Sequence, residues 1–192
     1  MNQYNQKWAF EYEGILTQQY DNFPTYFDKF LSLNNFDRIV EIGTSYGGLT
    51  LYLSNNFSGP FATLDMDNVK IDPKVKDLFD KNLVEFIHGD ELESSIVNHV
   101  VDKYITPPGK VVLLCDGGVK KDTIKEYSKF LKLGDKIAAH DFFIDSNAFN
   151  SQNNWEWMQI TQDSISDTIK KENLLLCDEY MLDIAWGVYE KK

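Results

Sequence analysis

The stretch RIVEIGTSYGGLTLYLS, residues 38–54, decides the fold that this sequence predicts. Its first five residues form an apolar run of strand length that contains one acid, Glu41. Small residues with three glycines follow, and apolar residues then recur with helical spacing. A strand that leads into a helix through glycines is typical of open α/β sheets, where backbone N–H groups and the positive end of a helix face a ligand crevice.

The same alternation of strand and helix continues along the chain. Strands are expected at 61–65, 83–88, 110–116 and 136–142, and helices start near Pro24, after Gly47, at Pro73 and along 96–104 and 124–131. The tail segments 174–180 and 184–191 predict a closing antiparallel hairpin. The sequence therefore predicts an α/β, doubly wound, mostly parallel seven-stranded sheet in one domain, 1–192, with a helical lead-in at 1–36 and an α/β core at 37–192.

Composition narrows the range of partners. The 192 residues are 43% hydrophobic, enough for one sizeable core. Thirty acidic against 19 basic residues give a formal charge of −11, which disfavours nucleic acid and anionic lipid surfaces. No basic n-region with an apolar h-region opens the chain, so a cytoplasmic protein without a membrane partner is expected. Cys115 and Cys177 lie in apolar runs and are expected to pack as small hydrophobes.

The glycine spacing disfavours two common cofactor classes, the nicotinamide and flavin dinucleotides and the nucleoside triphosphates ATP and GTP. Gly43, Ser45 and Gly48 stand where a dinucleotide fingerprint requires three glycines, so the middle glycine is missing. Leu49 follows Gly48 where a phosphate loop requires lysine. What remains is Glu41-x-Gly43-x-x-x-Gly47-Gly48, whose acid suits a cationic ligand better than a phosphate. The alternative is that these glycines only permit tight packing of the strand on the helix.

This arrangement resembles motif I of class I S-adenosylmethionine-dependent methyltransferases. Asp65 ends the next strand, where that superfamily has the acid that binds the ribose hydroxyls, and Gly89-Asp90 end the third strand, beside the adenine. Residues 13–48 are similar to the cephalosporin-hydroxylase and macrolide-sugar O-methyltransferase group, in which a glutamine precedes the first helix; Gln18 and Gln19 both qualify. The resemblance implies S-adenosylmethionine as cofactor, bound by Glu41, Gly43, Thr44, Ser45, Gly47, Gly48, Asp65, Gly89 and Asp90.

Acids also follow the fourth and fifth strands. Asp116 ends one strand and His140-Asp141 end the other, and such ends share one rim of a parallel sheet. In the resembled group, acids at these positions hold Mg²⁺, so Asp116, His140 and Asp141 are candidate metal ligands as well as candidate catalytic residues. His140 replaces a carboxylate and is a softer ligand, which favours another divalent cation or a role as general base. The alternative is that Asp116 and Asp141 only cap the elements that follow.

The resulting hypothesis is an S-adenosylmethionine-dependent methyltransferase that modifies a hydroxyl of a small molecule or glycan. A metal-dependent hydroxylase-like enzyme on the same scaffold and a non-catalytic nucleoside-binding protein remain alternatives, and self-association stays open. Segment 142–162 is either a lid or a mobile connection, and its Trp155 and Trp157 either stack an acceptor or pack in the core. His88 and His99 are given no catalytic role, and a solvated pair is expected at Lys120 and Lys121.

Overall fold

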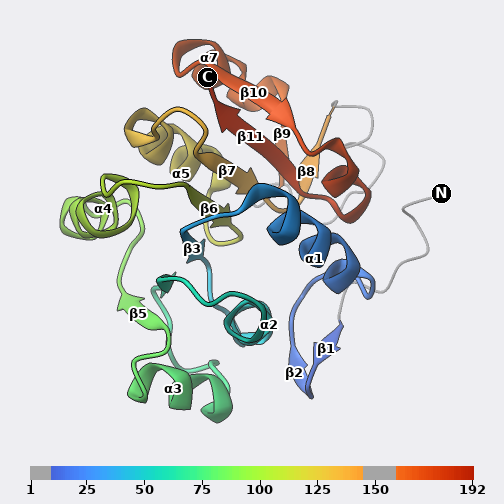
Figure 1. The fold of residues 1–192 in the computed structure, drawn as a ribbon, viewed down its shortest axis with the longest axis vertical. Helices are drawn as coiled ribbons and strands as arrows, with labels where there is room; N and C mark the ends of the chain where they lie inside the picture. The colour runs from blue at the N-terminus through green and yellow to red at the C-terminus, as the bar shows by residue number, and fades with distance from the viewer. Residues whose placement is uncertain (1–9, 145–158) are drawn as a thin grey trace.

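The computed structural model describes residues 10–144 and 159–192, and its centre is a seven-stranded sheet (Figure 1). In spatial order the strands are β10 (Leu174–Cys177), β11 (Gly187–Lys191), β7 (Lys136–Ala139), β6 (Val111–Cys115), β3 (Arg38–Ile42), β4 (Phe61–Asp65) and β5 (Glu85–His88). Strands β7, β6, β3, β4 and β5 are parallel, whereas β11 is antiparallel to both β7 and β10. The predicted fold class is confirmed, including the C-terminal antiparallel strand pair.

Helices follow most of the parallel strands. They are α1 (Phe23–Asn34), α2 (Gly48–Asn56), α3 (Pro73–Asp80), α4 (Ser94–Val100), which continues as a π-helical turn η2 (Val101–Ile105), and α5 (Lys120–Tyr127), which continues as a 3₁₀ turn η3 (Ser128–Phe130). Near the C-terminus, η4 (Asp163–Ile165) leads into α7 (Ser166–Lys171), and η5 (Glu179–Ile184) connects β10 to β11. None of the helices in the described ranges combines the length and the apolar character of a membrane span.

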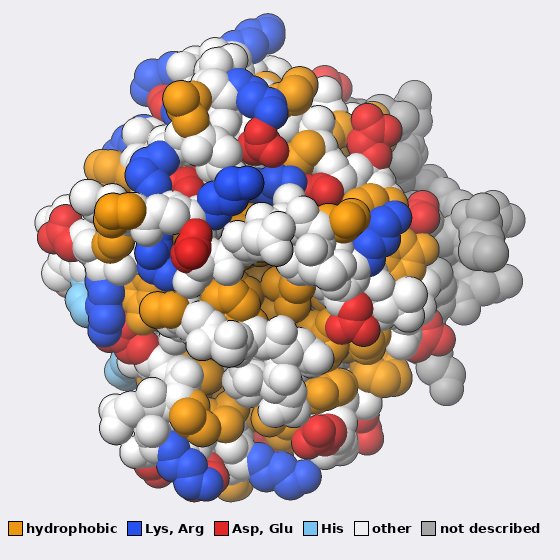
Figure 2. Space-filling view, in the orientation of Figure 1, with side chains coloured by type: hydrophobic (Ala, Val, Ile, Leu, Met, Phe, Trp, Pro, Cys, Tyr) orange, Lys and Arg blue, Asp and Glu red, His pale blue; other side chains and the backbone are white. Residues whose placement is uncertain are grey.

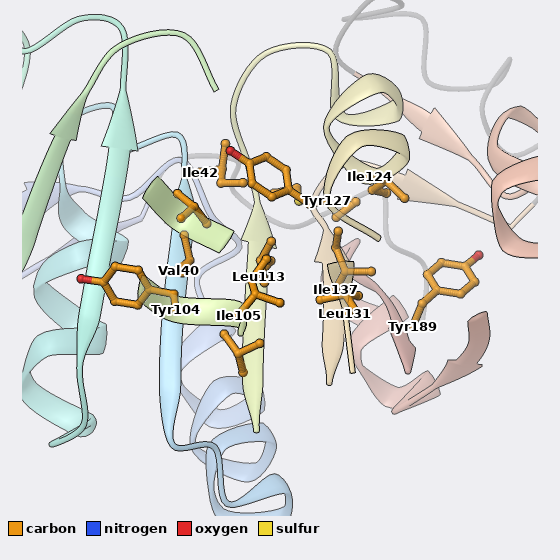
Figure 3. Packing of buried hydrophobic residues seen from close by; sticks show 14 of the residues in the cluster. Val40, Ile42, Tyr104, Ile105, Leu113, Ile124, Tyr127, Leu131, Ile137 and Tyr189 are labelled. Carbon is orange, nitrogen blue, oxygen red and sulfur yellow. The ribbon is translucent and has the colours of Figure 1, made fainter. Parts of the chain in front are cut away.

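Both faces of the sheet are buried, which explains the nearly continuous apolar runs of its strands. On one face, Val40 and Leu113 pack with Tyr104 and Ile105 of η2 and with Ile124 of α5 (Figure 3). On the other face, Ile39, Val112 and Leu114 pack against phenylalanines of α1, aromatic and aliphatic residues of α2, and Trp186. Because α1 and α2 cover one face and α4 and α5 the other, the carboxyl ends of the strands are left as the place for a ligand.

Local sequence explains where these elements begin. Pro24 stands in the first turn of α1, and Asn35 ends that helix in the left-handed conformation. Asp72 caps α3 by accepting a hydrogen bond from Lys74 N at 2.8 Å. Arg38, at the start of β3, is buried and donates to the carbonyl oxygens of Tyr104, Pro107, Pro108 and Gly109, which fixes the loop before β6.

Two small sheets were not predicted. In the lead-in, β1 (Glu11–Tyr12) pairs with β2 (Ile15–Leu16) ahead of α1, so its described part is a hairpin as well as a helix. β8 (Phe142–Phe143) pairs in parallel with β9 (Ile160–Thr161), which joins the two ends of the long segment 142–162. Trp155 and Trp157, and the question of a lid, fall outside the described residues. On the face shown in Figure 2, basic and acidic side chains are interspersed.

Candidate functional site

A cleft of about 690 Å³ lies at the carboxyl ends of β3, β4 and β6. Five of the predicted site residues line it: Gly43, Ser45, Asp65, Asp90 and Asp116. Its wall is strongly acidic, since it also includes Asp67, Glu91 and Asp122, with Lys70 as the basic residue in the same lining. The volume is in the range of small-molecule sites, and the charge favours a cationic ligand.

The protein's own backbone leaves no room for a side chain at Gly43. Its φ is +103°, and a Cβ at this position would lie 2.4 Å from the backbone N of Gly117 and 2.6 Å from the backbone C of Asp116. The loop after β3 therefore lies directly against the loop after β6, which brings Asp116 to the cleft. The space beside Gly43 where a Cβ would lie is taken by the backbone of Gly117.

Asp65 organises the part of the cleft between β3 and β4. Its two carboxylate oxygens accept the backbone N–H groups of Ser45 at 2.8 Å and of Asp67 at 3.0 Å. Ser45 Oγ in turn donates to Gln18 Oε1 at 2.7 Å, so Gln18 reaches the cleft from the lead-in. Asp90 accepts the backbone N–H of Leu92 at 2.9 Å. Backbone N–H groups thus orient both acids, from the loops after β3 and β4 for Asp65 and from its own loop for Asp90.

The remaining predicted cofactor residues, Glu41, Thr44, Gly47, Gly48 and Gly89, are not part of the cleft lining. Thr44 shares a hydrogen bond of 2.6 Å with Thr63. A Cβ on Gly47 would meet the side chain of Val75 at 2.8 Å, and one on Gly48 the carbonyl oxygen of Leu16 at 2.6 Å. These two glycines permit close packing around α2, and their roles toward a cofactor remain predictions.

Glu41 is a buried acid behind the cleft. Its side chain is 1% exposed, and Oε2 accepts a hydrogen bond from Thr50 Oγ1 at 2.6 Å. Oε1 is buried and has no hydrogen-bond partner among the described residues. Burial raises the pKa of Glu41 to about 8, although the hydrogen bond from Thr50 opposes this shift.

Asp116, His140 and Asp141 meet beside this cleft, as the sequence predicted. Nδ1 of His140 lies 2.9 Å from Asp116 Oδ1 and 3.8 Å from Asp141 Oδ1. His140 is 3% exposed and stacks on Trp186, with the ring centroids 5.1 Å apart. Asp141 adopts a left-handed φ of +55°, which is uncommon for a residue other than glycine. The three residues offer donor atoms within 4.8 Å of one another, so their spacing alone does not exclude a metal ion.

Lys120 is a member of the same cluster, and the expectation of a solvated lysine at this position was wrong. It is 1% exposed, and its Nζ lies 3.0 Å from Asp141 Oδ2 and 4.0 Å from Asp116 Oδ1. The side chain lies in the first turn of α5, and the two carboxylates compensate the charge that this helix end disfavours. Its neighbour Lys121 is exposed, as expected.

The structure also distinguishes Gln19 from Gln18. The indole N–H of Trp186 donates to Gln19 Oε1 at 2.9 Å, and Gln19 Nε2 donates to Asp116 Oδ2 at 2.6 Å. Because an indole N–H can only donate, it fixes the orientation of the amide, and Asp116 must be an acceptor. Sequence reasoning missed Gln19 as a partner of Asp116 because the two residues are 97 positions apart.

The charges of this cluster act on one another. Burial by itself lowers the pKa of His140, but the carboxylates of Asp116 and Asp141 outweigh burial, and the net pKa is above its ordinary value. For Asp141, burial raises the pKa, yet His140 and Lys120 outweigh it and lower the net value. His140 Nε2 is buried and has no hydrogen-bond partner among the described residues. Because Nδ1 is directed at Asp116, Nε2 is the ring nitrogen that is left without such a bond.

Comparisons with known proteins agree with this fold. The family model described as rhamnosyl O-methyltransferase/CmcI matches residues 3–184. Among solved structures, CmcI in its Mg–SAM form has 13% identity and a TM-score of 0.71, covering 95% of this chain and 76% of CmcI. A putative caffeoyl-CoA O-methyltransferase from Staphylococcus aureus has 18% identity and a TM-score of 0.63. The match covers 88% of this chain and 83% of that protein. The O-methyltransferase TomG from Streptomyces achromogenes, in complex with SAM, has 12% identity and a TM-score of 0.60. The match covers 90% of this chain and 80% of TomG. No curated protein matches by sequence.

Proposed function

Because this chain belongs to the rhamnosyl O-methyltransferase/CmcI family of S-adenosylmethionine-dependent methyltransferases, we propose that it transfers the methyl group to a hydroxyl of a small molecule or sugar. The observation that carries the proposal is the contact between the buried His140 and Asp116, which lines the acidic cleft. His140 presents an unpartnered Nε2 among the described residues, and Asp116 holds the opposite ring atom.

The cleft fits the proposed cofactor. S-adenosylmethionine carries an ammonium, a sulfonium and a carboxylate, hence one net positive charge, and the wall of the cleft is mostly acidic. Asp65 and Asp90 line the cleft, and the resemblance to the methyltransferases assigns them to the ribose hydroxyls and the adenine. When bound, the cofactor supplies a methyl group on a sulfonium, which passes to an oxygen nucleophile as the C–S bond breaks and the C–O bond forms.

The chain's own residues supply proton removal and orientation. Asp116 accepts the Nδ1 proton of His140, which leaves Nε2 as the base that takes the proton of the acceptor hydroxyl. The imidazolium that results is stabilised by Asp116 and Asp141, which face its other nitrogen. Trp186 stacks on the imidazole and restricts its rotation. These contacts favour proximity and proton transfer as the source of catalysis.

A divalent metal fits this arrangement poorly. Asp116 already accepts hydrogen bonds on both oxygens, from His140 and Gln19, and Asp141 Oδ2 accepts from Lys120. A metal would have to share these oxygens with their present donors, and it would lie close to a buried ammonium. We therefore derive no step through a metal ion, and the spacing of the three candidate ligands is explained by their mutual hydrogen bonds and ion pairs.

The cofactor part of the proposal is tested by calorimetry. Replacing Asp65 by Asn retains the shape of the side chain but removes a charge from the cleft, and S-adenosylmethionine should bind about tenfold more weakly, or ~1.4 kcal/mol. Asp77→Asn removes the same charge from an exposed site on α3 and should leave the affinity unchanged. Equal affinities of the wild type and Asp65→Asn would contradict the assignment of this cleft.

The catalytic part is tested with a panel of sugar and phenolic hydroxyl acceptors. Radiolabelled methyl should appear in at least one acceptor, and the label should be found on oxygen by mass spectrometry. Cofactor binding without transfer across the panel would instead support a nucleoside-binding protein.

A further inference from the structure

We propose that the buried ammonium of Lys120 is the resident cation of the Asp116–His140–Asp141 cluster and takes the place of a divalent metal. The inference rests on the proposed function, because it concerns how the same site keeps its acids paired and its base oriented. It follows from three observations on the described residues: the burial of Lys120, the engagement of the carboxylate oxygens, and the charge of the cluster.

Burying the ammonium of Lys120 at this position costs free energy, which its ion pairs with the two acids must offset. An ammonium that is 1% exposed loses nearly all of its hydration, and it lies in the first turn of α5, where the helix dipole opposes a cation. Its distances of 3.0 Å to Asp141 and 4.0 Å to Asp116 place it between the two acids. The ammonium therefore balances both carboxylates, which is the charge that a divalent ion held by these residues would otherwise supply.

Most of the carboxylate oxygens are already held without a metal. Three of their four oxygens accept hydrogen bonds from described side chains: Asp116 from His140 and Gln19, and Asp141 from Lys120. The amide of Gln19 cannot rotate to release Asp116 without breaking its bond from Trp186. His140 directs Nδ1 at Asp116, so this nitrogen donates a proton and is not available as a metal ligand.

Charge balance leads to the same conclusion. Two carboxylates, one ammonium and a neutral imidazole leave one negative charge, which protonation of His140 during proton transfer neutralises. A divalent ion would instead leave a net positive cluster and repel Lys120 at short range. Lys120 is therefore a positioning residue: it acts on the reaction through Asp116 and Asp141, and its charge allows His140 to function as a base without a metal.

The test is a metal titration that does not depend on knowing the acceptor. Wild-type protein saturated with S-adenosylmethionine is titrated with Mg²⁺ and with Mn²⁺ by calorimetry, and Mn²⁺ binding is followed by electron paramagnetic resonance. No site tighter than millimolar is expected. Lys120→Met removes the ammonium but keeps an unbranched side chain, so one Mn²⁺ site per chain should appear. Lys120→Arg keeps the charge and should bind no metal, and Lys121→Met, at the exposed neighbour, should match the wild type.

The outcomes separate this inference from the proposed function. A tight Mn²⁺ site in the wild type that Asp141→Asn abolishes would overturn the inference while leaving the methyltransferase proposal intact. Failure of the wild type to bind S-adenosylmethionine would count against the proposed function instead. If Lys120→Met does not fold, the wild-type titration and Lys120→Arg still decide, since a metal site in either would contradict a resident ammonium.

Discussion

At the scale of single residues, His140 carries most of the proposed chemistry. Its two nitrogens have different surroundings: Nδ1 faces the carboxylates of Asp116 and Asp141, whereas Nε2 has no partner among the described residues. Burial disfavours the charged ring, but the two acids favour it more strongly, even with Lys120 opposing them. The net effect is a pKa above that of an ordinary histidine.

This balance predicts the pH profile of methyl transfer. Because the pKa of His140 is raised, the rate should increase with pH and reach half of its maximum above the ordinary value of 6.5. His140→Gln should flatten that increase and leave cofactor affinity nearly unchanged. His99→Gln, at an exposed histidine that pairs with Glu85, serves as the control and should keep the wild-type profile. A rate that is half-maximal below pH 6.5, or an unaltered profile in His140→Gln, would exclude this role.

Glu41 predicts a second pH effect, on stability. Its pKa is raised from 4.5 to about 8 by burial, so the folded state binds this proton more tightly than the unfolded state. The associated stability is complete below pH 4.5 and is lost as pH rises toward about 8. Glu41→Gln cannot ionise, so it does not lose this stability as pH rises. The free energy of unfolding of the variant should therefore increase relative to that of the wild type across this interval, by up to about 1.4 kcal/mol per pKa unit. Urea unfolding at several pH values measures the difference, and a difference independent of pH would contradict the expectation.

At the scale of secondary-structure elements, the site depends on how closely the ends of β3 and β6 approach. Gly43 follows β3 and lies against the backbone of Asp116 and Gly117, which follow β6. On the far side of β6, the loop after β7 carries His140 and Asp141. Three consecutive strand ends in the sheet therefore set the distance between the cleft and the proposed base.

Gly43→Ala should disrupt this approach and destabilise the fold. The new Cβ would overlap backbone atoms at 2.4 and 2.6 Å, which cannot move as a flexible side chain can, so a loss of about 3 kcal/mol or more is expected. Gly14→Ala is a matched control: its φ is also positive, at +81°, but nothing lies within 4 Å of a Cβ there. It should lose only about 1 kcal/mol from backbone strain. Equal losses in the two variants, measured by urea unfolding, would show that the contact with Gly117 is unimportant.

At the scale of the whole molecule, electrostatics favours a cationic ligand over its neutral product. The chain carries a formal charge of −11, and the cleft concentrates acids at the carboxyl ends of the strands. S-adenosylmethionine loses its sulfonium charge on methyl transfer and becomes electrically neutral. The field of the molecule should therefore hold the substrate form more strongly than the product form.

Salt should weaken the binding of the two forms to different extents. Raising ionic strength from about 0.05 to 0.5 M shortens the screening length and should reduce the affinity for S-adenosylmethionine, while affinity for S-adenosylhomocysteine changes less. Calorimetry of both ligands across the salt series measures this contrast. Identical salt dependence of the two affinities would show that the acids of the cleft do not act on the sulfonium.

The sequence by itself determined the sheet and its mostly parallel order, because these depend on local signals. The cofactor class came from the resemblance of residues 41–48 to motif I of the methyltransferases. Apolar runs such as 111–115 specify strands, glycines specify turns, and acids at strand ends fall on one rim in any sheet of this topology. Asp116, His140 and Asp141 could be grouped for that reason alone. Only the tertiary structure decided the partners of that group. Lys120 reads as a surface lysine, and Gln19 and Trp186 lie 167 positions apart, so no local pattern indicates that they meet Asp116 and its neighbours. Burial and long-range packing fix those contacts. The contacts in turn place the ammonium of Lys120 beside Asp116 and Asp141.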